Sequence, residues 1–80
     1  MQEATPKIAV VGLGYVGLPL AVALARSFPT VGYDIDESRI DELKRGHDRT
    51  HEVDRAAIAT IEASADPKVL DGRDVYLSLI

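Results

Sequence analysis

A run of glycines early in the chain restricts the fold more than any other feature. Residues 12–17 read Gly-Leu-Gly-Tyr-Val-Gly, a G-x-G-x-x-G pattern. The segment before it, Lys7–Val11, is short, apolar and β-branched, which is typical of a buried strand in a parallel sheet. After it, Leu20, Leu24 and Phe28 recur at the spacing of one helix face. The pattern therefore predicts a strand, a tight glycine turn and a helix.

Each glycine of this pattern has a physical task in such a unit. We expect Gly12 to make the turn off the strand, Gly14 to let a ligand approach the backbone, and Gly17 to allow close packing of the helix. The amides near Tyr15 and Val16 would point out of the helix end, where the helix dipole favours an anion. The glycines therefore predict a loop that binds the pyrophosphate of a dinucleotide. The alternative is a glycine turn needed for packing alone.

The remainder of the chain continues the alternation of strands and helices. Asp36 is expected to cap the second helix, with Ile35 and Ile40 forming a hydrophobic staple across its first turn. The predicted elements are a strand over Thr30–Asp34, a helix over Glu37–Arg45, a short helix after Asp54 to about Ile61, a short strand over Ala63–Ala65, a helical turn from Pro67, and a strand over Val75–Ile80. This order predicts an α/β fold with a parallel sheet. Residues 1–80 would form the N-terminal half of a doubly wound Rossmann domain, with the other half and any substrate domain absent.

An acidic residue stands where such a domain binds ribose. Asp34 ends the second predicted strand, roughly 20 residues after Gly12. A carboxylate there accepts hydrogen bonds from ribose hydroxyls and repels a 2′-phosphate, which favours NAD over NADP. The alternative for Asp34 is a loop or capping role. Arg39 lies on the ribose side, where it could reach the adenosine end of the cofactor, accommodate a 2′-phosphate, or simply be solvated.

Composition excludes several other functions. The chain has 80 residues with 9 Lys and Arg against 13 Asp and Glu, a net charge of −4, which disfavours nucleic acid as a partner. It has no cysteine, so thiolate metal sites and cysteine nucleophiles are excluded within it. The apolar stretch Ile8–Ala25 is interrupted by glycine and proline and predicts neither a membrane span nor a signal peptide. The default location is the cytoplasm.

The remaining polar residues give no further site. His47 and His51 are four residues apart in a predicted loop with no third ligand, so we expect a surface pair and no metal site. Asp48 and Glu52 are interpreted as solvated loop acids and Asp54 as a helix cap. No residue of the chain is predicted to be catalytic. Tyr76, on the last strand, is expected to pack in the core.

The motifs together resemble one family. Residues 8–20, Ile-Ala-Val-Val-Gly-Leu-Gly-Tyr-Val-Gly-Leu-Pro-Leu, are similar to the start of the UDP-glucose/GDP-mannose dehydrogenase family, and the similarity continues through residues 31–36, 39–50 and 74–77. Residues 46–50, Gly-His-Asp-Arg-Thr, followed by Glu52 and Val53, resemble the branch that contains the UDP-N-acetylhexosamine 6-dehydrogenases of surface-polysaccharide synthesis.

The resemblance implies an enzyme of which this chain carries one part. Such enzymes oxidise the C6 alcohol of a UDP-sugar to an acid while two NAD are reduced, using a cysteine, a lysine and an asparagine that belong to later segments. The resemblance assigns Gly12, Gly14, Tyr15, Val16 and Gly17 to the pyrophosphate loop, Asp34 to the ribose and Arg39 to the adenosine side. The family usually has a Val-Pro-Thr-Pro segment after the fourth strand, whereas residues 77–80 here are Leu-Ser-Leu-Ile. The UDP-sugar site would lie outside this chain.

Two rival interpretations remain open at this point. The chain could be a stand-alone dinucleotide-binding module without catalysis, or a glycine-loop fold that binds FAD or S-adenosylmethionine. As the first half of a Rossmann domain, the chain would leave its last predicted strand with an unpaired apolar edge, from which we expect a homo-oligomer or poor solubility when the chain is made alone.

Overall fold

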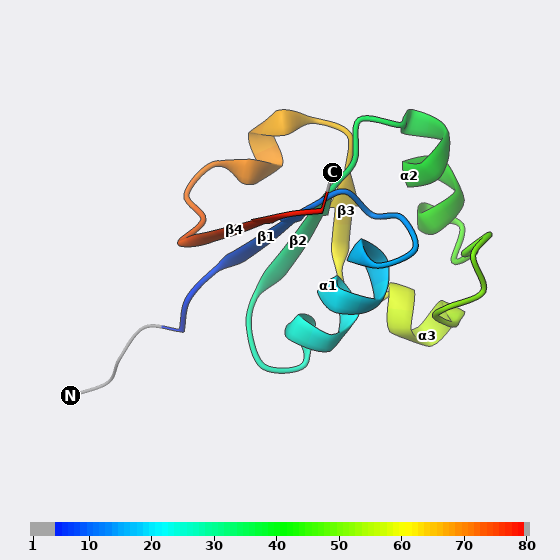
Figure 1. Cartoon of the computed structure of the whole chain (residues 1–80), viewed down its shortest axis with the longest axis horizontal. Helices are drawn as coiled ribbons and strands as arrows, with labels where there is room; N and C mark the ends of the chain where they lie inside the picture. Colours follow the sequence, from blue (N-terminus) through cyan, green and yellow to red (C-terminus); the bar gives the residue numbers. More distant parts are fainter. Residues whose placement is uncertain (1–4, 80) are drawn as a thin grey trace.

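The computed structural model describes residues 5–79 and contains a four-stranded parallel sheet with helices around it (Figure 1). The elements in chain order are β1 (Ile8–Val11), α1 (Gly17–Ala25), β2 (Thr30–Tyr33), α2 (Glu37–Lys44), α3 (Arg55–Ile58), β3 (Glu62–Ser64), the 3-10 helix η1 (Pro67–Leu70) and β4 (Val75–Ser78). Their types and order confirm the sequence prediction, with bounds that differ by a few residues. Ile80, assigned to the last strand from sequence, lies outside the described residues.

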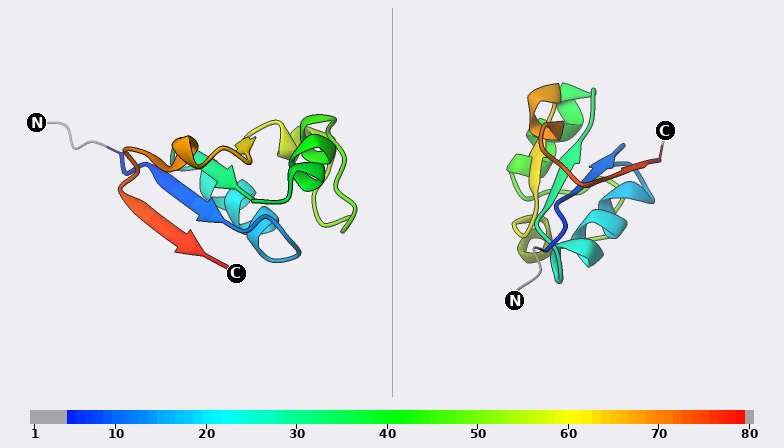
Figure 2. Two further views of the ribbon diagram at one scale, coloured as in Figure 1. Left: turned by 90° about the horizontal axis from the view of Figure 1, so that it is seen from above. Right: turned by 90° about the vertical axis from the view of Figure 1, so that its left-hand side faces the viewer.

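The strand order confirms the predicted fold class. The sheet runs β3-β2-β1-β4 with every neighbouring pair parallel, which is the order of the first four strands in a Rossmann sheet. Helix α1 lies on one side of the sheet and η1 on the other (Figure 2). The register pairs Val11 with Tyr33. Strands β1 and β2 therefore end side by side, and the residues that follow each strand are neighbours in space.

The core forms where α1 and α2 cover the sheet. Its buried apolar side chains come from β1, the glycine loop, both helices and α3. They are Ile8, Val10, Leu13, Leu18, Ala21, Val22, Ile40, Leu43 and Ile58. Burial of the leucine, isoleucine and valine side chains among them contributes about 1.5–3 kcal/mol each to stability relative to exposure.

The helix face expected from the spacing of Leu20, Leu24 and Phe28 also includes Ala21, and the structure bears this face out in part. Ala21 is buried together with Leu18, whereas Leu20, Leu24 and Phe28 are half-buried. Leu24 and Phe28 pack against the core, although Phe28 lies beyond the end of the helix at Ala25.

Helix α2 has the predicted cap but lacks the predicted staple. The Asp36 carboxylate accepts hydrogen bonds from the amides of Ser38 and Arg39. Ile40 is buried, but Ile35 is 77% exposed and cannot pack against it. The staple prediction was wrong because the chain at Ile35 turns outward between β2 and the capping residue.

Strand β4 forms one edge of the sheet. Tyr76, which we expected in the core, is 52% exposed, and its hydroxyl donates a 2.6 Å hydrogen bond to the Leu70 carbonyl. Val75 and Leu79 are also exposed at 40% and 41%. The expectation of an apolar edge at this strand is confirmed. The core role of Tyr76 was wrong, because on this edge strand the side chain lies half exposed and reaches η1 through its hydroxyl.

Candidate functional site

The glycine loop leaves β1 through a turn that needs a glycine. Gly12 has a φ of 100°, in the region that L side chains rarely adopt, and its amide donates to the Tyr33 carbonyl at 2.8 Å. The next residue, Leu13, buries its side chain completely. A Cβ added to Gly32 would lie 2.7 Å from the Leu13 side chain. The absence of a side chain at Gly32 on β2 therefore makes room for Leu13 beneath the loop.

The other two glycines of the pattern do different work. A Cβ at Gly17 would lie 1.7 Å from the Gly12 carbonyl oxygen, so the first turn of α1 packs directly on the loop. A Cβ at Gly14 would meet nothing within 4 Å. Gly14 therefore faces open space, which is what a ligand approaching the backbone requires. The predicted tasks of Gly12 and Gly17 agree with this geometry.

Unused donors and exposed apolar side chains adjoin that open space. Among the described residues, the amides of Gly14, Tyr15 and Val16 donate to no protein group. Tyr15 and Val16 are 66% and 65% exposed. Amides at the start of a helix, next to exposed apolar surface, suit a ligand that combines an anion with flat rings. The residues present fit a dinucleotide.

Asp34 lies directly beside this loop. Its Oδ2 accepts the Leu13 amide at 2.9 Å, and its Oδ1 accepts the Asp36 amide at 2.9 Å. The side chain is half-buried. Each carboxylate oxygen has acceptor capacity left after one hydrogen bond, so Asp34 can still accept from ligand hydroxyls. The sequence-predicted ribose acid and the sequence-predicted phosphate loop are thus in direct contact.

Arg39 is not the solvated residue that was one alternative from sequence. It is 5% exposed, and its Nε donates to the Leu13 carbonyl oxygen at 2.7 Å. Its Nη1 donates to Asp48 at 2.9 Å and lies 3.3 Å from Glu42. Its Nη2 is buried without a hydrogen-bond partner among the described residues. Burial contradicts the solvated alternative, and the guanidinium is directed at the glycine loop and at two carboxylates.

Asp48 holds a position that the sequence interpretation missed. It is 4% exposed and accepts hydrogen bonds from the Thr50 hydroxyl at 2.7 Å and from the amides of Thr50, Glu52 and Val53 at 2.9–3.1 Å. Burial opposes its ionisation, but the donors from Thr50, Arg39 and Glu52 outweigh it and hold the Asp48 pKa well below its usual range. The description of Asp48 as a solvated loop acid was wrong. A threonine two residues after an aspartate is the pattern of a side-chain-stabilised turn and could have indicated it.

Glu42 completes this buried group of charges. It is 4% exposed, accepts the Arg49 amide at 2.6 Å and forms an ion pair with the Arg49 guanidinium. The hydrogen bond from the Arg49 side chain is the largest cause of a lowered Glu42 pKa. Glu42 is thus shared between Arg49 and Arg39, whereas Asp48 is the closer carboxylate to Arg39.

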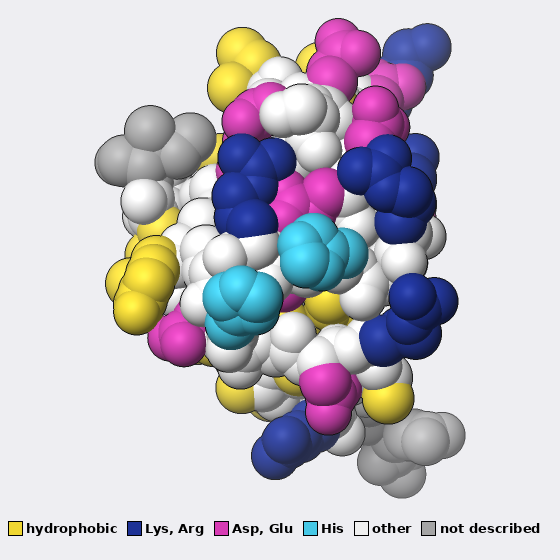
Figure 3. All heavy atoms as spheres, turned by 90° about the vertical axis from the view of Figure 1, so that its right-hand side faces the viewer, with side chains coloured by type: hydrophobic (Ala, Val, Ile, Leu, Met, Phe, Trp, Pro, Cys, Tyr) yellow, Lys and Arg dark blue, Asp and Glu magenta, His cyan; other side chains and the backbone are white. Residues whose placement is uncertain are grey.

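The other candidate residues remain apart from this site. Figure 3 shows both histidine side chains at the surface, and the rings of His47 and His51 are 6.2 Å apart in a T-shaped arrangement. Within residues 5–79, no group of three or more side chains could hold a metal ion. Glu52 is exposed, and Asp54 caps α3 through the Ala57 amide at 2.9 Å, as predicted.

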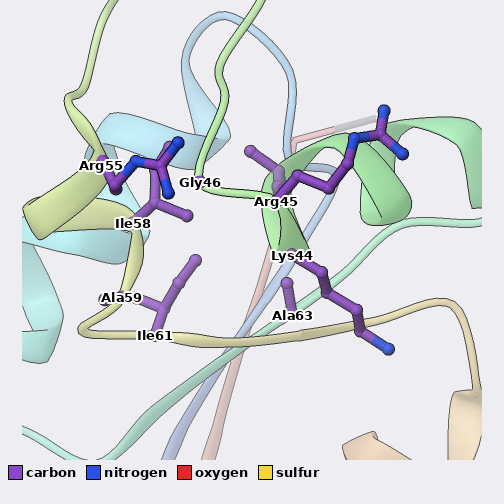
Figure 4. Close-up of a pocket in the computed structure, with 9 residues that line it drawn as sticks. Lys44, Arg45, Gly46, Arg55, Ile58, Ala59, Ile61 and Ala63 are labelled. Atoms are coloured by element: carbon purple, nitrogen blue, oxygen red, sulfur yellow. The ribbon is translucent and has the colours of Figure 1, made fainter.

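A hollow of about 340 Å³ between α2, α3 and β3 is separate from the glycine loop. Its apolar wall includes Ile58, Ile61 and Ala63, and Arg55 lies beside Gly46 at its rim (Figure 4). The residues that line this hollow include none from the glycine loop. The candidate site is the glycine loop with Asp34 and the buried charges of Arg39, Glu42 and Asp48.

The family of the chain follows from a match to residues 6–68. The matching model is that of the UDP-glucose/GDP-mannose dehydrogenase family, NAD binding domain. Because these residues make up most of the chain, the chain belongs to this family. The family and the cofactor NAD predicted from sequence are both confirmed.

Similar proteins agree with the predicted branch. Protein CapL of Staphylococcus aureus is 63% identical over 46 residues, covering 58% of this chain and 11% of that protein. A UDP-N-acetyl-D-glucosamine 6-dehydrogenase of Pseudomonas aeruginosa is 58% identical over 52 residues, covering 65% and 12%. A UDP-N-acetyl-D-mannosamine dehydrogenase of Methanocaldococcus jannaschii is 47% identical over 49 residues, covering 60% and 12%. The matched segments thus span about a tenth of these relatives.

A solved structure supports the fold. The UDP-glucose dehydrogenase from Pyrobaculum islandicum superposes with a TM-score of 0.82 at 23% identity, covering 96% of this chain and 20% of that chain. Among residues 5–79, no helix has the length and apolarity that crossing a membrane requires.

Proposed function

We propose that this chain is the NAD-binding segment of a nucleotide-sugar 6-dehydrogenase. The enzyme would oxidise the C6 alcohol of a UDP-N-acetylhexosamine to the uronic acid, with two NAD reduced, for surface-polysaccharide synthesis. The observation that carries the proposal is the direct hydrogen bond between the Leu13 amide and Asp34. It joins the glycine loop to the carboxylate that would bind the ribose. The names of the similar proteins support the choice of sugar.

The loop would bind the cofactor pyrophosphate. In this proposal Gly12 sets the turn, Gly14 provides the open approach, and the amides near Tyr15 and Val16 donate to the anion. Gly17 keeps the start of α1 close to the loop, so that the helix dipole acts on the same anion. NAD supplies hydride acceptance when bound, while these residues bind and orient its adenosine half.

Asp34 would bind the adenosine ribose and select NAD. Its remaining acceptor capacity suits the ribose hydroxyls, and its charge repels a 2′-phosphate. Arg39 also belongs to this cofactor site. Its guanidinium donates hydrogen bonds to the Leu13 carbonyl and to Asp48. We therefore propose that Arg39 contributes to cofactor binding by holding the glycine loop in place.

The catalytic groups would lie in other segments of a longer protein. The chain has no cysteine for a thioester intermediate, and no described residue is proposed as catalytic. The UDP-sugar would bind outside this chain. We further propose that the full-length enzyme is a cytoplasmic homo-oligomer. A net charge of −4 gives no reason to propose nucleic acid as a partner.

The test is activity of the full-length protein encoded by the gene that contains this sequence. Purified protein is incubated with NAD and either UDP-N-acetylglucosamine or UDP-N-acetylmannosamine, with UDP-glucose as the control sugar. The expected result is formation of NADH and the sugar acid with one of the N-acetyl sugars, at two NADH per sugar oxidised. A gene product that ends at Ile80, or that binds NAD and oxidises no UDP-sugar, would favour the stand-alone binding module instead.

A further inference from the structure

The backbone amide and carbonyl of Leu13 are both held by side chains of residues that follow β2 in the chain. The Leu13 amide donates to Asp34 at 2.9 Å, and the Leu13 carbonyl accepts from Arg39 at 2.7 Å. The Leu13 side chain is fully buried beneath. Leu13 is therefore held on both sides of its backbone, and we infer that the loop amides further along take their directions from it.

Arg39 needs a partner of its own to hold that carbonyl. A buried guanidinium is stable only when its charge is paired. Asp48 provides the closer pairing, at 2.9 Å from Nη1, and the Asp48 side chain is 0% exposed. Glu42 lies at 3.3 Å and also pairs with Arg49. Asp48 is thus the main neutralising group behind the guanidinium.

Asp48 in turn is fixed by the segment that follows it. Its two oxygens accept one hydroxyl and three amides from Thr50, Glu52 and Val53. A carboxylate with this many donors has one orientation. The chain of contacts runs from residues 50–53 through Asp48 and Arg39 to the Leu13 carbonyl.

We propose that Asp48 is a positioning residue for the cofactor loop, which acts through Arg39 on the Leu13 carbonyl and so sets the affinity for NAD. The proposal rests on the proposed function, because it assumes that the loop binds NAD. The Asp48 side chain is itself fully buried, so it acts through Arg39. Its removal loosens the loop by leaving the Arg39 guanidinium with a single shared carboxylate.

The first experiment compares Asp48→Asn with a matched control in the full-length protein. Asn keeps the size of the side chain but removes the charge that pairs with Arg39. The expected result is an NAD dissociation constant raised about tenfold, equivalent to about 1.4 kcal/mol, with the KM for the UDP-sugar unchanged. The control is Asp54→Asn, the same chemical change at an exposed acid that caps α3 and makes no hydrogen bond to Arg39. It is expected to leave NAD affinity unchanged.

A double-mutant cycle separates action through Arg39 from general destabilisation. Arg39→Met alone is expected to weaken NAD by a similar factor, and the double variant with Asp48→Asn is expected to be no weaker than Arg39→Met. Residues that act through one contact are non-additive in this way, whereas independent effects add. Additive losses would overturn the proposal.

A milder variant covers the case in which Asp48→Asn does not fold. Thr50→Val removes the hydroxyl that orients Asp48 and leaves every charge in place; it is expected to weaken NAD about two- to threefold. Unchanged NAD affinity in Thr50→Val, or equal losses in Asp48→Asn and Asp54→Asn, overturns the proposal. If the wild-type protein itself binds no NAD, the proposed function fails, and that outcome is distinct from failure of the Asp48 contact chain alone.

Discussion

The Leu13 amide and the Asp34 carboxylate are 2.9 Å apart and joined by a hydrogen bond, although 21 positions separate them in the chain. This contact makes the phosphate loop and the ribose acid one unit. The parallel register that pairs Val11 with Tyr33 brings the two together. Any change that moves the loop therefore moves the carboxylate as well.

Alanine substitutions at Gly14 and Gly17 should separate an effect on folding from an effect on NAD binding. Gly17→Ala places a methyl 1.7 Å from the Gly12 carbonyl, so we expect α1 or the loop to shift and the thermal midpoint of the full-length protein to fall. Gly14→Ala meets no protein atom within 4 Å, so we expect an unchanged thermal midpoint and weaker NAD binding. Thermal denaturation and NAD titration of both variants check this. Similar losses of stability in both would contradict it.

Truncation of Leu13 should reduce both stability and NAD affinity. The side chain is fully buried beneath the loop, and removal of a buried leucine costs about 2–5 kcal/mol in unfolding free energy. Leu13→Ala should also weaken NAD, because the loop rests on this side chain. The control is Leu43→Ala, a side chain of the same size that is buried on α2. Chemical denaturation should show comparable destabilisation in both, and equal loss of NAD affinity in both would be inconsistent with a loop-specific role.

Acid should loosen the segment around Asp48. The Asp48 pKa is lowered from its ordinary 3.8 and the Glu42 pKa from its ordinary 4.5. A carboxyl whose pKa is depressed in the folded state stabilises the fold above the unfolded pKa, and this contribution is lost as pH falls toward the folded pKa. We therefore expect opening of residues 48–53 to increase as pH drops below about 4.

Amide hydrogen exchange of the full-length protein across that pH range measures this opening, after correction for intrinsic rates. In Asp48→Asn the same amides should be less protected at neutral pH and should change less on acidification. Parallel pH dependence in the wild type and in Asp48→Asn would show that another group controls the segment.

The β4 edge should make the isolated 80-residue chain self-associate. Val75, Tyr76 and Leu79 are exposed there, and edge strands with apolar side chains pair with other strands. Light scattering at increasing concentration should show oligomers. A lysine at Tyr76 should reduce them, whereas a lysine at exposed Glu37 on α2 should not. A monomer at high concentration would contradict the expectation.

The fold could be predicted from the sequence, and so could the glycine loop and the position of Asp34. The glycine pattern after an apolar run, and an acid at the end of the next strand, depend on spacing and backbone needs that a sequence displays directly. The parallel sheet followed from the alternation of strands and helices.

The sequence was insufficient where burial depends on what packs over a residue. Arg39, Glu42 and Asp48 are residue types that usually lie at the surface. The local sequence does not indicate that their charges pair with one another inside the protein. The prediction for Tyr76 was wrong for the opposite reason, since its alternating pattern suits a core but its strand lies at the exposed edge of the sheet. Ile35 does not form the predicted hydrophobic staple. The Asp36 amide donates a hydrogen bond to Asp34, and in the turn that this bond closes the Ile35 side chain is exposed.

Titration of NAD and NADP into the full-length wild-type protein and Asp34→Ala tests whether this carboxylate binds the ribose and selects the cofactor. We predict that the wild type binds NAD more tightly than NADP, and that Asp34→Ala binds NAD more weakly and loses most of that preference. Asp66→Ala, at an acid that caps η1, is the control and should keep both affinities. Unchanged affinities for both cofactors in Asp34→Ala would contradict the claim that this carboxylate holds the ribose.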